Sequence, residues 1–158
     1  MNASPQAAAI IKIMKGKGLT LATAESITGG GLGEVFTSIS GASAVYQGGI
    51  ITYSDVSKTK FLGILKRTLN KYTAVSEEVA IEMAQSVRAQ FKSDYAISTT
   101  GVAGPGRAYD QKVGTVWIAI DSRLGTTSLQ LALSGDRAQI RHATIESALA
   151  TFTRILIS

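Results

Sequence analysis

Ser26 is the first side chain of this sequence whose type and position suggest covalent chemistry. It follows the apolar run "TLATAE", residues 20–25, and precedes glycines at positions 29–31 and 33. A serine at a tight strand-to-helix junction can act as a nucleophile, or it can simply cap the helix that follows. The residues around Ser26 leave both interpretations open.

The glycine cluster matches none of the common phosphate or nucleophile loops. A P-loop needs Gly-Lys-Ser/Thr after its glycines, but here "LGEVF" follows. The dinucleotide fingerprint fails because Phe36 stands where its third glycine belongs, counted from Gly31 and Gly33. The Gly-x-Ser-x-Gly elbow is also absent, because "AESIT" has no glycines.

The candidate bases for a serine nucleophile are few. The chain has no cysteine and one histidine, His142, which falls inside the predicted last helix. Disulfides, thiolate catalysis and cysteine-ligated zinc are therefore excluded, and nothing in the sequence brings His142 near Ser26. One histidine and scattered carboxylates do not form the ligand shell of a transition metal. The sequence does not exclude a loosely bound magnesium ion. We predict no cofactor.

A lysine is the remaining candidate base, since serine–lysine pairs are an established form of hydroxyl activation. Lys58 falls in the first turn of a helix predicted from Asp55 to Leu62, where the helix dipole disfavours a cation. Tyr53, near the predicted end of the preceding strand, is placed to orient the pair or relay a proton. Alternatively, Lys58 points to solvent and pairs with Asp55. Residue spacing alone does not distinguish a Lys58 that acts as a base from one that points to solvent.

Strand and helix patterns alternate along the chain and predict an α/β sandwich. The predicted strands are residues 20–25, 45–54, 95–100, 113–121 and 127–133. The predicted helices are residues 6–15, 31–38 and 55–62, one that begins after Ser76 with Val79, Met83, Val87 and Phe91 on its inward face, and a last one capped by Asp136. The loop between the last two strands is too short for a parallel crossover, so one strand is predicted to be antiparallel.

Length and composition indicate a single domain over residues 1–158, since 45% of the residues are hydrophobic. No apolar run is long enough to span a bilayer. The N-terminal segment carries its lysines after its apolar stretch, which favours a first helix over a signal peptide. A cytoplasmic protein is expected.

The formal net charge of +5 suits either nucleic acid or an anionic small substrate. The densest basic group lies near Phe61 and Tyr72, and consists of Lys58, Lys60, Lys66, Arg67 and Lys71. No nucleic-acid-binding motif accompanies it. We therefore interpret this group as a solvated helix face and do not expect nucleic acid as a partner.

Several motifs occur in an order that resembles the CinA C-terminal domain family. They are "TAESITGG", "GGIITYSDVSK", "AVSEEVAIEMA", "TTGVAGPG", "KVGTVWIAI" and "SGDR", and they extend from Leu21 to beyond Arg137. The resemblance implies a three-layer α/β/α sandwich with a mixed, mainly parallel sheet. Some members carry a larger N-terminal domain of another kind. This sequence does not contain one, so the short stand-alone form is expected.

The family includes nicotinamide-nucleotide amidases, and the resemblance implies their activity. That activity is hydrolysis of nicotinamide mononucleotide to nicotinate mononucleotide and ammonia, a step in NAD recycling. The family's serine nucleophile, tyrosine and lysine fall on Ser26, Tyr53 and Lys58. The resemblance also implies a homo-oligomer, most simply a dimer.

Substrate contacts follow from the same resemblance. The expected oxyanion donors are backbone N–H groups at the start of the following helix, at Thr28, Gly29, Gly30 and Gly31. The expected phosphate contacts are Thr100, Gly101, Gly104 and Arg137. For Arg137, a salt bridge with Asp136 or another acid is the alternative.

Two departures from the family pattern concern substrate handling. Gly48 stands where an arginine is common, and the loop "GPGRAYDQKVG" lacks the usual further glycines and proline, so that Arg107 and Tyr109 can alter access. Two other functions therefore stay open. One is a member that binds a pyridine nucleotide with little or no turnover, and the other is a competence-linked, partner-binding protein.

Overall fold

The computed structural model describes residues 4–158 and contains a five-stranded sheet in the order β2-β1-β3-β4-β5. The strands are β1 (Leu21–Glu25), β2 (Tyr46–Ile51), β3 (Tyr95–Gly101), β4 (Thr115–Ser122) and β5 (Gly125–Ala132). β1 pairs in parallel with β2 and β3, whereas β4 is antiparallel to both β3 and β5. Only β4 therefore opposes the other strands of the described chain, which confirms the mixed, mainly parallel sheet.

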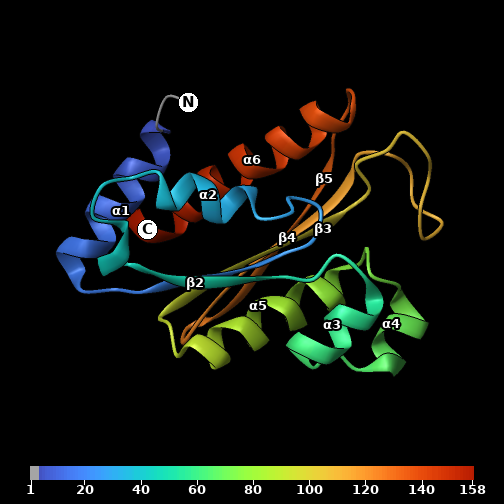
Figure 1. Cartoon of the computed structure of the whole chain (residues 1–158), viewed down its shortest axis with the longest axis horizontal. Coiled ribbons are helices and arrows are strands. Elements are labelled where there is room, and N and C mark those ends of the chain that lie inside the picture. The colour runs from blue at the N-terminus through green and yellow to red at the C-terminus, as the bar shows by residue number, and fades with distance from the viewer. Residues whose placement is uncertain (1–3) are drawn as a thin grey trace.

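Helices cover both faces of the sheet (Figure 1). On one face lie α1 (Pro5–Lys17), α2 (Gly31–Thr37) and α6 (Arg137–Ile157), and on the other lie α3 (Asp55–Leu62), α4 (Lys66–Tyr72) and α5 (Glu77–Phe91). A short 3₁₀ turn, η1 (Ala42–Ala44), precedes β2. Each helical layer buries its own apolar cluster against the sheet. The three-layer α/β/α prediction is confirmed.

Local capping explains why α3 has the predicted bounds. The Ser54 hydroxyl accepts from the Ser57 N–H, the Ser57 side chain accepts from the Ser54 N–H, and Gly63 ends the helix in the left-handed conformation. β2 ends at Ile51 and not at residue 54 as predicted, because after the bond from Thr52 N–H to Glu25 C=O at 2.9 Å the chain turns toward the cap. This turn brings α3 to the end of β1.

The predicted inward face of α5 is buried, with Val79, Met83 and Val87 fully enclosed and Phe91 half-buried. The Ser76 hydroxyl accepts from the Val79 N–H at 3.3 Å and caps the helix as predicted. α5 therefore packs against β1 and β3, two strands whose C-terminal ends lead to candidate site residues.

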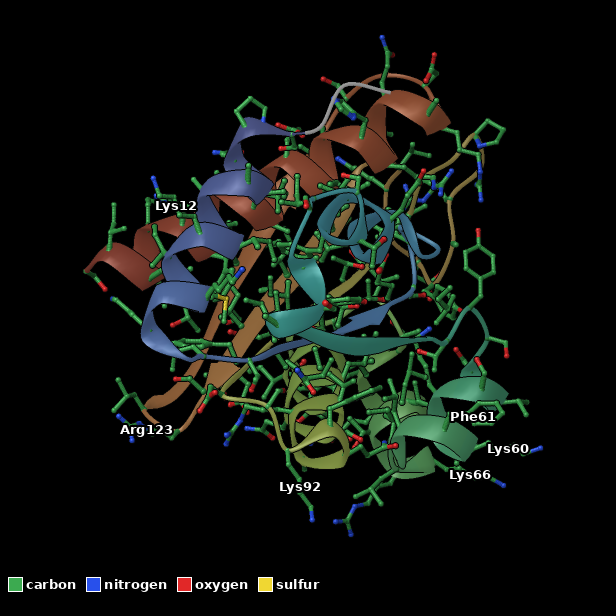
Figure 2. The ribbon with its side chains drawn as sticks, turned by 60° about the vertical axis from the view of Figure 1, so that its left-hand side comes forward. Lys12, Lys60, Phe61, Lys66, Lys92 and Arg123 are labelled. Carbon is green, nitrogen blue, oxygen red and sulfur yellow. The ribbon has the colours of Figure 1, made fainter. Side chains whose placement is uncertain are left out.

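The basic group divides between two helices and is not one helix face. Lys60 and Lys66 extend outward from α3 and α4 beside Phe61 (Figure 2), and the Lys60 ammonium lies 5.3 Å from the centroid of the Phe61 ring. Lys58 is buried instead, at 1% exposure. The solvated-face interpretation is therefore wrong for Lys58. No helix within residues 4–158 has the length and apolarity needed to cross a bilayer.

Parallel strands align their carboxyl ends, so β1, β2 and β3 deliver their following residues to one edge of the sheet. Ser26 follows β1, the segment that leads to Lys58 follows β2, and the loop at residues 102–114 follows β3. That loop extends past the sheet at the end where α3 and α4 lie (Figure 1). The fold thus gathers three sequence motifs that are far apart in the chain.

Candidate active site

Ser26 and Lys58 meet at this edge of the sheet. The Ser26 N–H donates to the Thr99 carbonyl at 2.9 Å, which holds the serine at the end of the strand pairing. The Lys58 Nζ lies 2.9 Å from the Ser26 Oγ and 2.8 Å from the Thr52 carbonyl oxygen. A neutral Lys58 amine at this distance can accept the Ser26 hydroxyl proton.

Burial lowers the pKa of the Lys58 amine from 10.5 to about 8, because removal from water disfavours the charged form, and the Asp55 carboxylate opposes this effect. Asp55 is not within ion-pair distance of Lys58. The alternative of a solvent-exposed Lys58 paired with Asp55 is therefore wrong. Burial is the main cause of the lowered pKa.

The Glu25 carboxylate occupies the start of α2. Its Oε2 accepts from the N–H groups of Gly30 and Leu32, both at 3.0 Å, and its Oε1 accepts from the Gly33 N–H at 2.7 Å. The Thr28 hydroxyl also donates to Glu25, at 2.6 Å. A buried anion thus already uses the donors at this helix N-terminus.

The other amides of the expected oxyanion site are also occupied. The Gly29 N–H donates to the Ser26 carbonyl and the Gly31 N–H to the Thr28 carbonyl, each at 3.0 Å. Gly29, Gly30 and Gly31 therefore have no N–H left for a substrate, and none of them lines the cavity at Ser26. The expectation that these three amides form the oxyanion site is wrong.

The glycines serve the turn and its close packing. Gly30 has a φ of 98°, and a Cβ on Gly33 would lie 2.7 Å from the Tyr46 hydroxyl and 3.4 Å from the Glu25 carboxylate. A side chain at position 33 would thus displace groups packed around the buried carboxylate. Access of a substrate is not what requires glycine here.

A cavity of about 250 Å³ opens beside the Ser26–Lys58 pair. The expected catalytic residues and expected phosphate contacts that line it are Ser26, Tyr53, Lys58, Thr100, Gly101, Gly104 and Arg137. Thr28 does not line it, because this residue is fully buried and its hydroxyl contacts Glu25 and Thr99. The structure therefore brings together the serine, the lysine and the predicted glycine-rich loop after β3.

Tyr53 lies at the rim and not between the serine and the lysine. Its side chain is 60% exposed, and its hydroxyl accepts from the Arg137 guanidinium. Within residues 4–158 it has no hydrogen bond to Ser26 or Lys58, so a proton relay through Tyr53 is not formed. Arg137 also donates to the Gly104 carbonyl at 2.7 Å and has no ion pair with a described acid, so the salt-bridge alternative is wrong.

The donors that face the outer cavity differ from those expected. The Thr100 hydroxyl donates to the Ala74 carbonyl at 2.7 Å, so its proton is not available to a phosphate. The backbone N–H groups of Ala103, Gly104 and Gly106 have no partner among residues 4–158. These amides and the Arg137 guanidinium are the donors with spare capacity at this end of the cavity.

The two departures from the family pattern have different consequences. Tyr109 lines the cavity, and its hydroxyl donates to the Asp55 carboxylate at 3.1 Å, which ties the loop to the start of α3. Arg107 stays within the loop and donates to the Asp110 carbonyl at 3.1 Å. Gly48 is remote from the cavity lining, with a φ of 145° and the Phe91 ring where a Cβ would stand.

Glu25 and Arg141 are site residues that the sequence did not indicate. The Arg141 Nε donates to the Ile27 carbonyl at 3.1 Å, and its Nη2 donates to the Thr28 carbonyl at 2.9 Å. An acid that ends a buried strand just before several glycine amides could have pointed to Glu25. Arg141 gave only a weak signal, four residues after Arg137 on the same helix. His142 is exposed and does not line the cavity.

Comparisons with known proteins agree with this architecture. The family model described as the CinA C-terminal domain matches residues 3–156. A relative from Caldanaerobacter subterraneus subsp. tengcongensis named as a competence-damage inducible protein is 44% identical over 148 residues, which is 93% of this chain and 36% of the relative. A Clostridium botulinum protein of the same name is 45% identical over 142 residues, covering 89% and 35% of the two chains. The chain thus spans about a third of the length of these curated relatives.

Solved structures match along nearly their whole length. The competence/damage inducible protein CihA from Agrobacterium tumefaciens has a TM-score of 0.94 and 33% identity, with both chains fully covered. The competence damage-inducible protein A from Klebsiella pneumoniae has a TM-score of 0.96 and 32% identity, with 99% of this chain and 98% of that chain covered. The chain belongs to the CinA C-terminal domain family.

Proposed function

We propose that this chain is an amidase that hydrolyses nicotinamide mononucleotide to nicotinate mononucleotide and ammonia in pyridine nucleotide recycling. The observation that carries the proposal is the buried Lys58 amine 2.9 Å from the Ser26 hydroxyl, beside a cavity. Burial makes a far larger share of this amine neutral near physiological pH than in an ordinary lysine, and the neutral form is the one that can act as a base. The sequence motifs that resemble nicotinamide-nucleotide amidases supply the identity of the substrate.

Acylation proceeds by direct proton transfer between the two side chains. Neutral Lys58 takes the Ser26 proton as the Oγ forms a bond to the carboxamide carbon, and the amide oxygen becomes negative. Lys58 then protonates the amide nitrogen, the C–N bond breaks and ammonia leaves. Water attacks the resulting ester, Lys58 accepts the water proton and returns it to the Ser26 Oγ, and nicotinate mononucleotide departs.

The phosphate of the substrate is assigned to the outer end of the cavity. Arg137 offers a planar fork that suits a phosphate, and the unpartnered N–H groups of Ala103, Gly104 and Gly106 add backbone donors. The carboxamide is then at the Ser26 end, where the base lies.

Ammonia release from nicotinamide mononucleotide tests this function. We expect release by the wild type and none above background from Ser26→Ala or Lys58→Met, because each change removes a reacting group. Lys60→Met is the matched control, since Lys60 is on the same helix but extends into solvent. Undiminished release from Lys58→Met would remove the lysine as the base.

The same assay distinguishes the alternatives. A protein that binds the nucleotide in calorimetry but releases no ammonia is a binding member of the family. Salt-sensitive DNA binding without nucleotide binding would instead support a competence-linked role.

A further inference from the structure

Two buried backbone N–H groups beside the nucleophile have no partner. They belong to Ile27 and Thr28, which are 3% and 0% exposed. Neither N–H donates to any group within residues 4–158, whereas the amides of Ser26, Gly29 and Gly31 all donate to carbonyls. Buried backbone donors without a partner are rare in folded proteins. Of the two residues, Ile27 lines the cavity, so its N–H calls for an acceptor supplied from outside the chain.

The neighbouring carbonyls determine where these N–H groups point. In a trans peptide the C=O and N–H bonds point to opposite sides of the chain. The Ser26 carbonyl accepts from Gly29 at 3.0 Å, so the Ile27 N–H of the same peptide points away from Gly29. The Ile27 carbonyl accepts from Arg141 at 3.1 Å, so the N–H of Thr28 points away from α6. Ile27 lines the cavity that contains the Ser26 hydroxyl.

Arg141 holds the two peptides that follow the Ile27 N–H, which are Ile27–Thr28 and Thr28–Gly29. Its Nε binds the Ile27 carbonyl, and its Nη2 binds the Thr28 carbonyl at 2.9 Å. The guanidinium is half-buried and has no ion pair with a described acid, so its charge acts on these carbonyls. Charge-assisted bonds of this kind are stronger than neutral ones, and a planar fork restricts the rotation of both peptides.

We propose that the Ile27 N–H is the oxyanion donor for Ser26, and that Arg141 is a positioning residue that fixes this donor from the carbonyl side of Ile27. This amide replaces the expected donors at positions 29–31. The developing negative oxygen of the tetrahedral intermediate is its missing acceptor. The substrate named above rests on the proposed function, but the role of Arg141 concerns any acyl or phosphoryl group attacked by Ser26.

The first test separates catalysis from binding. We expect Arg141→Met to lower kcat for nicotinamide mononucleotide at least about tenfold, since the loss of one oxyanion donor costs roughly 100-fold to 1,000-fold in another hydrolase. Arg141→Lys should fall between Arg141→Met and the wild type. The Kd of the substrate, measured by calorimetry in the Ser26→Ala background, should not change. The control is Arg154→Met, an exposed arginine on the same helix.

The second test does not depend on the natural substrate. A small dialkyl fluorophosphate phosphorylates an activated serine: the Ser26 Oγ–P bond forms, the P–F bond breaks, fluoride leaves and Lys58 takes the hydroxyl proton. We expect labelling of Ser26 at least about tenfold slower in Arg141→Met than in wild type or Arg154→Met, with Ser26→Ala unlabelled. The pH midpoint of labelling should stay at the wild-type value, because Lys58 keeps its buried position.

Equal labelling rates in Arg141→Met and wild type would overturn the proposal. A slower rate with a pH midpoint displaced upward would also overturn it, because the defect would then be a solvated Lys58. Wild-type protein that is labelled at Ser26 but releases no ammonia would refute the proposed substrate alone. The labelling comparison between the Arg141 variants would still test the oxyanion site.

Discussion

At the scale of single residues, the site depends on one amine removed from water. Burial lowers the pKa of Lys58, and the neighbouring Asp55 carboxylate partly opposes that shift. Tyr109 donates to Asp55 and lines the cavity together with Tyr53 and Arg137. The pH dependence of the reaction therefore reports on this arrangement.

We expect kcat/KM to rise with pH through a midpoint of about 8, the pKa of Lys58. Asp55→Asn should move that midpoint to lower pH, because the lost negative charge no longer favours the protonated amine. The amide oxygen of asparagine can still accept from Tyr109. Rate profiles over pH 6–10 measure the midpoint, and an unchanged or higher midpoint in Asp55→Asn would refute this account of the tuning.

The same buried amine should weaken the fold at neutral pH. Its pKa is about 8 in the folded chain and near the ordinary 10.5 when unfolded, so the unfolded state binds more protons between these values. The free energy of unfolding of wild type, relative to Lys58→Met, should therefore rise as pH increases from 8 to 10.5, by up to about 3 kcal/mol. Urea unfolding at several pH values measures the difference, and a constant difference would contradict the lowered pKa.

At the scale of elements, the N-terminus of α2 binds a carboxylate from the same chain. Glu25 ends β1, and its carboxylate accepts the N–H groups of Gly30, Leu32 and Gly33. The strand and the helix are thereby joined across the turn that carries Ser26. These hydrogen bonds to Glu25 explain why the N–H groups of Gly30 and Gly33 are not available to a substrate.

Glu25→Gln should destabilise the chain by about 2–3 kcal/mol, because the amide loses the charge-assisted bonds and its NH₂ group faces backbone donors. Glu34→Gln is the matched control, since Glu34 is an exposed acid on α2, the helix whose first amides bind Glu25. Denaturant unfolding of both variants measures the cost. Equal stabilities of the two variants would show that the carboxylate does not hold the turn.

At the scale of the whole molecule, the cavity is assembled from segments that only the fold brings together. Arg137 starts α6, yet its guanidinium reaches the Gly104 carbonyl of the β3–β4 loop and the Tyr53 hydroxyl before α3. The dimer implied by the family resemblance stays a prediction, which light scattering of the purified chain tests. The cytoplasmic location and the single domain stay predictions as well.

Arg137→Met should raise KM for nicotinamide mononucleotide at least about tenfold and leave kcat within about threefold, because a lost charged bond to the phosphate costs roughly 1.5–3 kcal/mol. Nicotinamide riboside, which lacks the phosphate, should be turned over equally by wild type and variant. If the variant discriminates between the two substrates as strongly as wild type does, Arg137 does not bind the phosphate.

Features encoded by neighbouring residues could be predicted from the sequence. The bounds of α3 follow from the Ser54 cap and Gly63, and the antiparallel β4 follows from a short hairpin loop. Residue types and the lack of a suitable histidine or cysteine made Ser26 and Lys58 candidates, and the family resemblance then assigned the nucleophile and the base to them. These inferences needed no knowledge of distant contacts.

Only the tertiary structure decided what each polar group contacts. Lys58 is 32 residues from Ser26, and Arg141 is 114 residues from Ile27, so no local pattern predicts either contact. Burial sets the pKa of Lys58, and Glu25 occupies the helix amides that the sequence suggested for an oxyanion. The sequence by itself therefore indicated the candidate reacting side chains and most elements, whereas packing decided charge and donor availability, because both depend on groups remote in the chain.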